Sequence, residues 1–492
     1  MPTHNRIAIV GSGFAGLGAA IKLMRAGFDD LVILERGDDV GGTWRDNTYP
    51  GCACDVESLL YSFSFAPNPH WTRKFAPQSE IWTYLQSCVE KYRLGPYLRF
   101  NCPLLGARWN DAEQHWELET GDGPRTADIL ITGTGPLSEP KVPDLPGLAN
   151  FSGTMFHSAR WDHDHDLTGR RVAIVGSGAS AVQFLPHVQK RAEHIVSFQR
   201  NAPWIVPRRD EPIGPRERRL FRIFPAAQRV ARLRIYLLRE MLVRGLLGNQ
   251  KMADMGQQVA LKHLIRRIPD LDLRAKLTPK YRFGCKRILL SDDYYPAVRQ
   301  PNVDVVTDGI ADIRADRIID GAGVVHEVDT LILATGFHVT DMPIAGLLHD
   351  AAGRSLAEHW QGSPQTYLGT TVTGFPNLFM LVGPNTGLGH SSIILMIEAQ
   401  LAYLLDCLRR MDRRGLSSVE VRPEAQRAFN VDVQRKMRTT AWTTGGCDSW
   451  YLDPYGRNTT LWPDTTWRFR LATRSFDPHA YVERGVTREP VG

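Results

Sequence analysis

The sequence lacks the marks of a membrane-spanning, secreted or nucleic-acid-binding protein. No run of about 18 apolar residues could cross a bilayer, and the N-terminus enters an apolar strand and a glycine turn without a separate signal segment. Seven cysteines among 492 residues form neither a disulfide framework nor paired metal-binding knuckles, so we expect free thiols and no metal site. No segment resembles a nucleic-acid-binding module. These absences predict a soluble, cytoplasmic protein.

Positive charge is concentrated in one segment. The formal net charge of the chain is +6, but residues 208–287 contain 21 basic and 7 acidic side chains, an excess of +14. Three explanations stay open: a solvated helical face, binding of nicotinamide cofactor phosphates, and peripheral contact with an anionic membrane surface.

A glycine-rich turn near the N-terminus has the pattern of a dinucleotide-binding unit. Residues 6–10 read as an apolar strand, residues 17–26 have helical spacing, and residues 31–34 read as a second strand. The turn between strand and helix contains Gly11, Gly13 and Gly16. The first glycine makes the turn, the second lets the backbone approach a pyrophosphate, and the third lets the helix pack against the strand.

Glu35 ends this unit and indicates which nucleotide it binds. It lies 19 residues after Gly16, where a carboxylate accepts hydrogen bonds from ribose hydroxyls but repels a 2′-phosphate. The first unit is therefore expected to bind FAD or NAD rather than NADP.

The same pattern recurs in the middle of the chain with the opposite charge at its end. Strands are expected at residues 171–175 and 194–198, and Arg200 and Asn201 stand near the position that Glu35 has in the first unit. The turn contains Gly176, Ser177, Gly178, Ser180 and Ala181. Alanine at the third glycine position is compatible with helix packing. An arginine attracts a 2′-phosphate, so the second unit is expected to bind NADP(H).

These units set the expected domain organisation, and the composition of 43% hydrophobic and 23% charged residues is that of a globular protein. Strands at 129–132 and 330–333 are expected to belong to the first and the second unit, respectively. A long helix is expected at 391–410. We predict an α/β protein with two Rossmann-like dinucleotide-binding domains, for FAD and NADP, and a helical insertion in the NADP domain. The expected ranges are 1–141 and 342–492 for the FAD-binding domain, 142–207 and 284–341 for the NADP-binding domain, and 208–283 for the insertion.

The string from Phe151 to Asp162 resembles, at every fixed position, the FxGxxxHxxxW(P/D) fingerprint of Baeyer–Villiger monooxygenases. Related N- and S-oxidising flavin monooxygenases have a similar string that usually ends differently. His157, inside the string, has two readings: a linker residue that positions the two domains, or a catalytic residue.

Two further blocks are similar to the same family. In the family, the block GGTW at 41–44, the block YPG at 49–51 and the following Asp55 line the flavin and the nicotinamide. The resemblance implies cofactor contacts for Thr43, Trp44, Tyr61 and Asp55. Trp44 and Tyr49 have the alternative reading of core aromatics.

The third block, at 283–287, implies that Lys286 joins Arg200 at the 2′-phosphate and that Arg287 approaches the flavin with Asp55 as its partner. A surface Lys–Arg pair is the alternative. The tail from Cys447 to Pro463 resembles the branch that contains hydroxyacetophenone monooxygenase.

The resemblance implies the reaction as well. NADPH would reduce FAD, O2 would form a C4a-peroxyflavin, and a small-molecule ketone would become an ester or lactone. The alternatives are an N- or S-oxygenating flavin monooxygenase and a flavin redox sensor without turnover. A thioredoxin-reductase-like enzyme fits less well, because only Cys52 and Cys54, in a CxC, stand near the flavin motif. Substrate identity and oligomeric state stay open.

Overall fold

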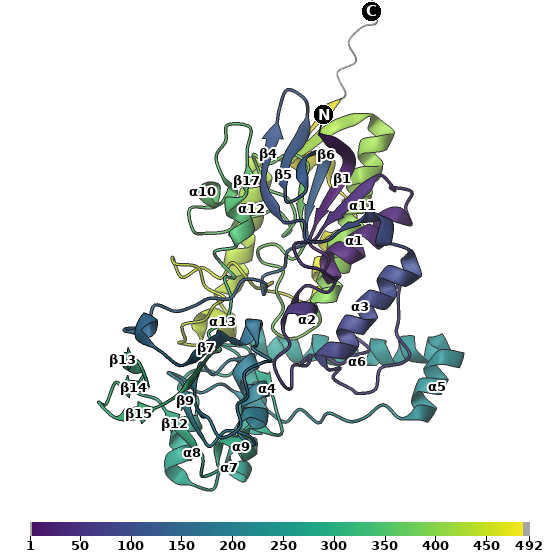
Figure 1. Ribbon diagram of the computed structural model, residues 1–492. Coiled ribbons are helices and arrows are strands. Elements are labelled where there is room, and N and C mark those ends of the chain that lie inside the picture. The colour runs from purple at the N-terminus through teal and green to yellow at the C-terminus, as the bar shows by residue number, and fades with distance from the viewer. Residues whose placement is uncertain (1, 486–492) are drawn as a thin grey trace, which may run out of the picture.

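The structure is a computed structural model that describes residues 2–485. Figure 1 shows two lobes: an upper lobe that holds the first and last of the described residues, and a lower lobe formed by the middle of the chain. Each lobe is built around its own sheet, and the sheets are covered by helices. The predicted α/β class with two Rossmann-like units is confirmed.

The upper lobe contains an eight-stranded sheet whose order is β17-β4-β5-β6-β1-β2-β3, with β18 paired to β6. Its strands are β1 (Thr3–Val10), β2 (Leu31–Leu34), β3 (Leu98–Arg99), β4 (Leu104–Asn110), β5 (His115–Thr120), β6 (Gly123–Thr132), β17 (Leu348–His349) and β18 (Leu378–Met380). Strand β1 pairs in parallel with β2 and β6, and Ile7, Ala8 and Ile9 are fully buried. Parallel strands covered on both faces are expected to be apolar throughout.

Helices from both ends of the chain cover this sheet. Helix α1 packs against α3 and α11, so a late segment of the chain completes the first lobe. The helices of this lobe are α1 (Phe14–Met24), α2 (Thr43–Asp46), α3 (Gln78–Tyr92), α10 (Leu356–Trp360), α11 (Ile393–Arg414), α12 (Pro423–Met437), α13 (Ala441–Thr444) and α14 (Thr466–Ala472). An antiparallel pair, β19 (Leu416–Val421) and β20 (Tyr481–Gly485), closes the lobe.

The lower lobe contains a five-stranded parallel sheet in the order β12-β9-β8-β16-β7. These strands are β7 (Thr154–His157), β8 (Arg171–Val175), β9 (His194–Phe198), β12 (Val303–Val306) and β16 (Thr330–Leu333). Helices α4 (Ala179–Val188) and α9 (Tyr294–Val298) pack together beside it. The smaller strands are β10 (Ile205–Val206), β11 (Leu289–Leu290), β13 (Ile310–Arg314), β14 (Arg317–Asp320) and β15 (Val325–Glu327).

Four helices lie between β10 and β11 in the chain: α5 (Pro215–Ile223), α6 (Pro225–Leu246), α7 (Gln250–Arg267) and α8 (Leu271–Leu277). Figure 1 shows α6 as a long teal helix below α3, with α5 at its far end. Across residues 2–485, no helix combines the length and the apolar character needed to traverse a bilayer.

Candidate active site

The first glycine turn has the shape of a nucleotide cradle. Gly11 has φ of +97°, and a β-carbon there would lie 2.8 Å from the carbonyl oxygen of Gly133. A β-carbon on Gly16 would lie 1.8 Å from the carbonyl oxygen of Gly11, so only glycine lets α1 begin so close to β1. A β-carbon on Gly13 would have its nearest neighbour, the α-carbon of Gly42, at 3.8 Å. Space at the middle glycine, above the N-terminus of α1, fits the pyrophosphate of a dinucleotide.

Glu35 lies at the end of β2 with only 4% of its surface exposed. One carboxylate oxygen accepts hydrogen bonds from the backbone N and Oγ of Ser12, at 2.9 and 2.7 Å. The other accepts from Gly37 N at 2.8 Å and Arg45 Nη1 at 2.9 Å. Burial by itself would raise the pKa of Glu35, but these donors outweigh burial and lower it. The carboxylate is thus ionised and its four acceptor positions are filled, so a ribose hydroxyl must replace one of these donors.

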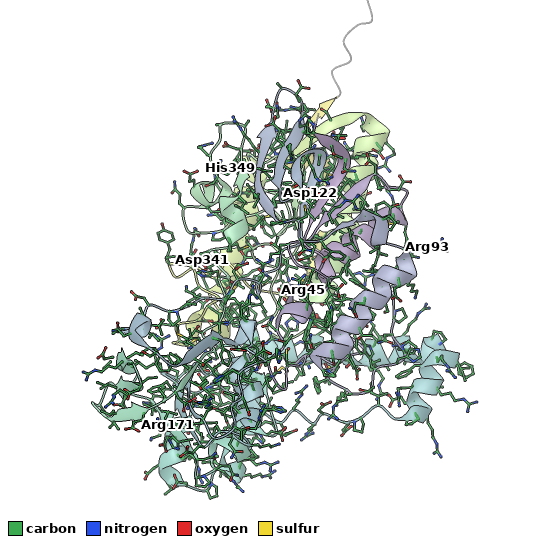
Figure 2. The ribbon with its side chains drawn as sticks, in the orientation of Figure 1. Arg45, Arg93, Asp122, Arg171, Asp341 and His349 are labelled. Atoms are coloured by element: carbon green, nitrogen blue, oxygen red, sulfur yellow. A yellow bond between two sulfur atoms is a disulfide. The ribbon has the colours of Figure 1, made fainter. Side chains whose placement is uncertain are left out.

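Arg45 lies on α2, near the centre of the molecule between the lobes (Figure 2). The same short helix carries Thr43 and Trp44. Trp44 is buried and donates a hydrogen bond from Nε1 to Tyr61 Oη at 3.1 Å. Tyr61 packs edge-on against Phe14, the first residue of α1. The structure therefore brings Trp44 and Tyr61 to the first cradle, as ordered aromatics that connect α2 to α1.

The second glycine turn repeats the first with one substitution. Gly176 has φ of +119°, and a β-carbon there would lie 2.3 Å from the carbonyl oxygen of Ala334. A β-carbon on Gly178 would meet no atom within 4 Å. Ala181, at the third position, is buried in α4, and Ser177 Oγ donates to the Asn201 carbonyl at 2.9 Å, while Ser180 lies on the first turn of α4. The space at Gly178 fits the approach of a second dinucleotide.

Two cations lie near one another beside this second cradle. Arg200 is exposed, two residues after the end of β9, and Lys286 Nζ lies 5.3 Å from the centre of the Tyr281 ring. Partial burial lowers the pKa of Lys286, and the nearby charge of Arg200 lowers it further. Like charges held together are a site for an anion such as a 2′-phosphate.

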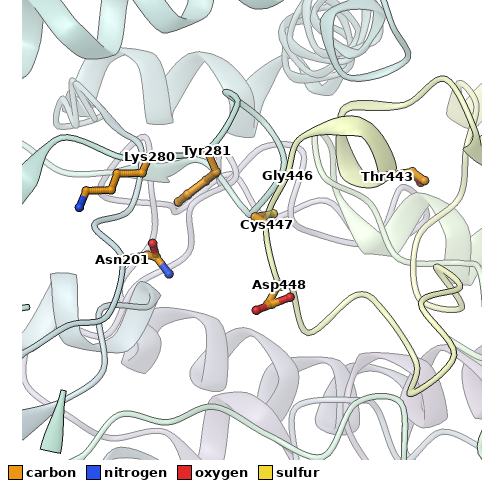
Figure 3. A pocket seen from close by; sticks show the side chains of 7 residues that line it. All are labelled: Asn201, Lys280, Tyr281, Thr443, Gly446, Cys447 and Asp448. Carbon is orange, nitrogen blue, oxygen red and sulfur yellow. The ribbon is translucent and has the colours of Figure 1, made fainter. Parts of the chain in front are cut away.

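A pocket of about 380 Å³ opens at the same place (Figure 3). Asn201 and Tyr281 line it from the lower lobe, facing the tail segment 443–448 that carries Asp448. The charge of Asp448 raises the pKa of Lys286 and so helps to keep it protonated, but the carboxylate itself would repel an anion bound here.

Arg287 and Asp55, which are 232 residues apart in the chain, form a forked ion pair. Arg287 Nε and Nη2 each donate to one Asp55 oxygen at 2.6 Å. The side chains are only 30% and 24% exposed. The Asp55 charge raises the pKa of Arg287, and Arg287 lowers the pKa of Asp55 against the opposing effect of burial. Arg287 Nη1 also contacts the Leu388 carbonyl at 3.4 Å, so a permanent positive charge is fixed at this point.

The loop that carries Asp55 is fixed to helix α4 of the lower lobe. Tyr49 Oη donates to Gln183 Oε1 at 3.0 Å, and Gln183 Nε2 donates to the Ala53 carbonyl at 2.9 Å. A β-carbon on Gly51 would lie 2.8 Å from the Gln183 carbonyl. Tyr49 is thus an interlobe contact as well as a buried aromatic. Gln183 belongs to no recognisable motif, so its role could not be predicted from the sequence.

Tyr451 is a second residue that sequence reasoning did not assign to the site. It is buried in a cluster with Leu246, Trp442 and Leu461, and its hydroxyl has no hydrogen-bond partner among residues 2–485. Burial raises the pKa of Tyr451 to about 12, and the charges of Arg287 and Asp55 act on it in opposite directions. It therefore remains a neutral phenol that has a free hydrogen bond to offer near Arg287.

His157 lies at the end of β7, at the edge of the lower sheet. Its Nδ1 accepts a hydrogen bond from Ala159 N at 3.1 Å, while Nε2 is buried and without a partner in the described part of the chain. Burial, and then the charge of Arg160, lowers the pKa of His157 to about 4. The ring is neutral near pH 7 and organises its own turn. These contacts favour the positioning role over proton transfer.

A pH-stability measurement tests the state of His157. Its pKa of about 4 lies below the ordinary 6.5, so the unfolded chain binds the extra proton first as the pH falls. The free energy of unfolding is therefore unaffected by this group above pH 6.5 and decreases as the pH falls toward 4, by up to roughly 3 kcal/mol. We expect His157→Gln to flatten the acid side of a urea-unfolding profile, relative to His70→Gln, which removes an exposed histidine. Parallel profiles for wild type and His157→Gln would contradict this.

The expectation of seven free thiols is wrong. Cys285 and Cys447 form a disulfide, while Cys52, Cys54, Cys88, Cys102 and Cys407 are free and buried. The partners are 162 residues apart, so their spacing carries no signal of the pairing. The bond joins the loop of Lys286 and Arg287 to the tail segment at the pocket.

Removal of this disulfide is expected to loosen the loop that holds Arg287. We expect Cys285→Ser/Cys447→Ser to lower the free energy of unfolding by about 2–4 kcal/mol and to raise KM for NADPH. Alkylation in denaturant without reductant should modify five thiols in the wild type. Modification of seven would show that the bond is absent, and Cys407→Ser is the control for loss of a buried sulfur.

Comparison with known proteins agrees with this arrangement. The sequence model of a family described as flavin-binding monooxygenase-like matches residues 4–345. A Baeyer–Villiger monooxygenase of Streptomyces coelicolor is 50% identical over 479 residues, covering 97% of this chain and 92% of that protein. A Baeyer–Villiger monooxygenase of Pseudomonas aeruginosa is 48% identical, covering 97% and 91%.

Solved structures have the same architecture. Cyclohexanone monooxygenase from Rhodococcus sp. Phi1, bound to NADP+, is 25% identical and superposes with a TM-score of 0.87 over 99% of this chain and 100% of that one. A complex of OTEMO with FAD and NADP is also 25% identical, with a TM-score of 0.87 over 98% and 100%.

Proposed function

The chain belongs to the flavin-binding monooxygenase-like family, and we propose on this basis that it inserts one oxygen atom of O2 next to a substrate carbonyl, converting a ketone into an ester or lactone. It is an NADPH-dependent flavoprotein monooxygenase of the Baeyer–Villiger type that uses FAD. The substrate is a small carbonyl compound, and the cytoplasm is the proposed compartment. The hydroxyacetophenone-monooxygenase-like branch stays a prediction from the tail sequence.

One observation carries the proposal: Arg287 and Asp55 are held together as a forked ion pair, in a chain with two glycine cradles that end in opposite charges, Glu35 after β2 and Arg200 after β9. FAD, when bound, supplies the chemistry that accepts hydride from NADPH and reacts with O2. The first cradle, with Gly11, Gly13, Gly16 and Glu35, would hold FAD. The second, with Gly176, Gly178 and Arg200, would hold NADPH.

The residues of this chain would bind the cofactors, orient the charged groups at the reacting centre and keep water away from it. Arg200 and Lys286 would hold the 2′-phosphate and so select NADPH over NADH. Arg287 would stabilise negative charge as it develops on the substrate oxygen, because a guanidinium stays charged at any relevant pH. Asp55 fixes the plane of that guanidinium through both hydrogen bonds. Thr43, Trp44 and Tyr61 would form a wall that keeps water from the reacting atoms.

An N- or S-oxygenating monooxygenase is the second candidate, since the description of the matching family, flavin-binding monooxygenase-like, names no particular substrate. The test is the purified FAD-loaded enzyme with NADPH and O2, offered a panel of ketones, amines and sulfides. We expect NADPH oxidation that depends on a ketone, and a product heavier by one oxygen atom. Incorporation of oxygen into amines or sulfides alone would overturn the Baeyer–Villiger assignment, and mass spectrometry with ¹⁸O2 distinguishes the outcomes.

A further inference from the structure

Helix α6 turns its polar side toward the protein. Gln228 donates to the Asn68 carbonyl at 2.6 Å, and Arg232 Nη1 donates to the carbonyls of Leu59 and Ser62 at 2.7 and 2.9 Å. Farther along the helix, Arg239 forms an ion pair with Glu57 at 2.8 Å.

A buried carboxylate completes this inner face. Glu240 accepts from the backbone N and Oγ of Thr466, the first residue of α14, at 3.1 and 2.5 Å. His390 lies 3.4 Å from the same carboxylate. These four polar residues of α6 thus anchor the helix to the upper lobe.

The same helix exposes a series of apolar side chains to solvent. Six of its large apolar side chains are between 49% and 57% exposed: Val230, Leu233, Leu237, Leu238, Met241 and Leu242. They recur every three or four residues, which places them on one stripe of the helix. Helix α5 and the residue that follows it continue the exposure with Leu220, Ile223 and Phe224, at 46%, 51% and 60%. Figure 1 shows α5 and α6 forming an arm that extends from the body below α3.

This concentration is unusual within the described part of the chain. Nine of its 26 large, exposed hydrophobic residues fall between residues 220 and 242. Scattered apolar residues on a surface need no explanation, but a contiguous group marks a contact surface.

Arginines border the apolar stripe. The exposed ones on α5 and α6 are Arg216, Arg219, Arg222, Arg229, Arg234 and Arg244, and within residues 2–485 none of them has a carboxylate partner. We call these arginines and the nine apolar residues the arginine-bordered face. Helix α14, which packs beside α6 through Thr466, also exposes Trp467 and Leu471, at 46% and 57%.

We propose that the arginine-bordered face docks the enzyme on an anionic lipid bilayer, with α5 and α6 lying in the plane of the lipid headgroups. An interfacial helix of this kind inserts its apolar side into the headgroup–acyl boundary, and arginines beside it meet the lipid phosphates. A second copy of the chain fits less well, because a twofold interface through this face would bring two sets of unpaired arginines together. Trp467 beside the helix has the side chain that is enriched at membrane interfaces.

The arginine-bordered face includes the same helix, α6, that packs against the loop of Lys286 and Arg287. Leu246, near the end of α6, is buried with Trp442, and a β-carbon on Gly284 would lie 2.4 Å from it. Bilayer contact at one part of α6 would therefore place an apolar phase near the site. The docking itself is independent of the proposed reaction, since binding is measured without turnover.

The experiment is cosedimentation of the FAD-loaded full chain with vesicles. One set is phosphatidylcholine alone and the other contains equal parts of phosphatidylcholine and phosphatidylglycerol. The apolar variant is Leu233→Gln/Leu237→Gln/Met241→Gln, and the charge variant is Arg219→Gln/Arg222→Gln/Arg229→Gln. The matched control is Leu105→Gln/Val324→Gln/Val325→Gln, whose side chains are 53%, 53% and 51% exposed but lie elsewhere. Thermal unfolding and bound FAD establish that each variant is folded.

We expect the wild type and the control to sediment with the anionic vesicles and not with phosphatidylcholine alone. The charge variant should lose roughly a hundredfold in partition coefficient, since each basic residue near the surface contributes about a factor of five. The apolar variant should lose a similar factor, and salt should release the wild type. Equal sedimentation of wild type and apolar variant would overturn the proposal. So would an absence of vesicle binding, above all if gel filtration shows a dimer that only the apolar variant dissociates.

Discussion

Arg287→Ala should continue to oxidise NADPH while forming at least about 100-fold less oxygenated product, since loss of one preorganised electrostatic group at a reacting centre costs about 100- to 1000-fold. The cause is the loss of the fixed cation that Asp55 holds by two hydrogen bonds of 2.6 Å. NADPH binding depends on Arg200 and Lys286 and should be little affected. Product is measured by mass spectrometry, and NADPH oxidation by its absorbance.

Two control variants distinguish loss of this catalytic role from loss of protein stability. Arg410→Ala breaks a pair with Glu483 in which both side chains are 23% exposed, a burial similar to that of the Arg287–Asp55 pair, but far from the cradles in sequence. It should lower stability without separating NADPH use from product formation. Arg287→Lys keeps the charge but loses the fork, so its product yield should fall between wild type and alanine. Normal oxygenation by Arg287→Ala would remove this residue from the mechanism.

Arg200→Ala should lower kcat/KM for NADPH by roughly 10- to 150-fold, which corresponds to the loss of one charge-assisted hydrogen bond of about 1.5–3 kcal/mol. The value for NADH should change little, because NADH has no 2′-phosphate. Lys286→Ala should act in the same direction, since Lys286 and Arg200 lie close enough for their charges to interact. Steady-state kinetics with both cofactors measures the change in preference.

Arg191→Ala is the matched control for charge. Arg191 is an exposed arginine of the same lobe that pairs with Asp166 at 2.6 Å, away from the second cradle. It should leave the ratio of NADPH to NADH activity unchanged. If Arg200→Ala lowers kcat/KM equally for NADPH and NADH, Arg200 supports the fold and does not bind the 2′-phosphate.

The strands of the two nucleotide units were predictable because each is a short apolar run at the spacing of a nucleotide-binding unit. The ranges 31–34, 171–175, 194–198 and 330–333 agree with the structure residue for residue. The long helix expected at 391–410 spans Ile393–Arg414. Local signals suffice in these places because the turn chemistry and the burial pattern agree.

The contacts between distant segments were not predictable in the same way. The Arg287–Asp55 pair came from family resemblance, and no feature of the two positions alone joins them across 232 residues. The Cys285–Cys447 bond, the Gln183 contacts and the free hydroxyl of Tyr451 depend on how the lobes meet. The sequence leaves the three explanations of the basic segment open, because periodicity gives the stripes of α6 but does not tell which stripe faces outward.

The attachment of the Asp55 loop to α4 makes the two lobes mechanically dependent. Gln183 holds the loop at Ala53, two residues before Asp55, and Arg287 comes from the segment that continues into β11 and the lower lobe. A hinge rotation of that lobe would pull on the aspartate through one connection and on the arginine through another. The two partners of the ion pair are thus both tied to the lower lobe, so the geometry of the pair depends on how that lobe is placed against the upper one.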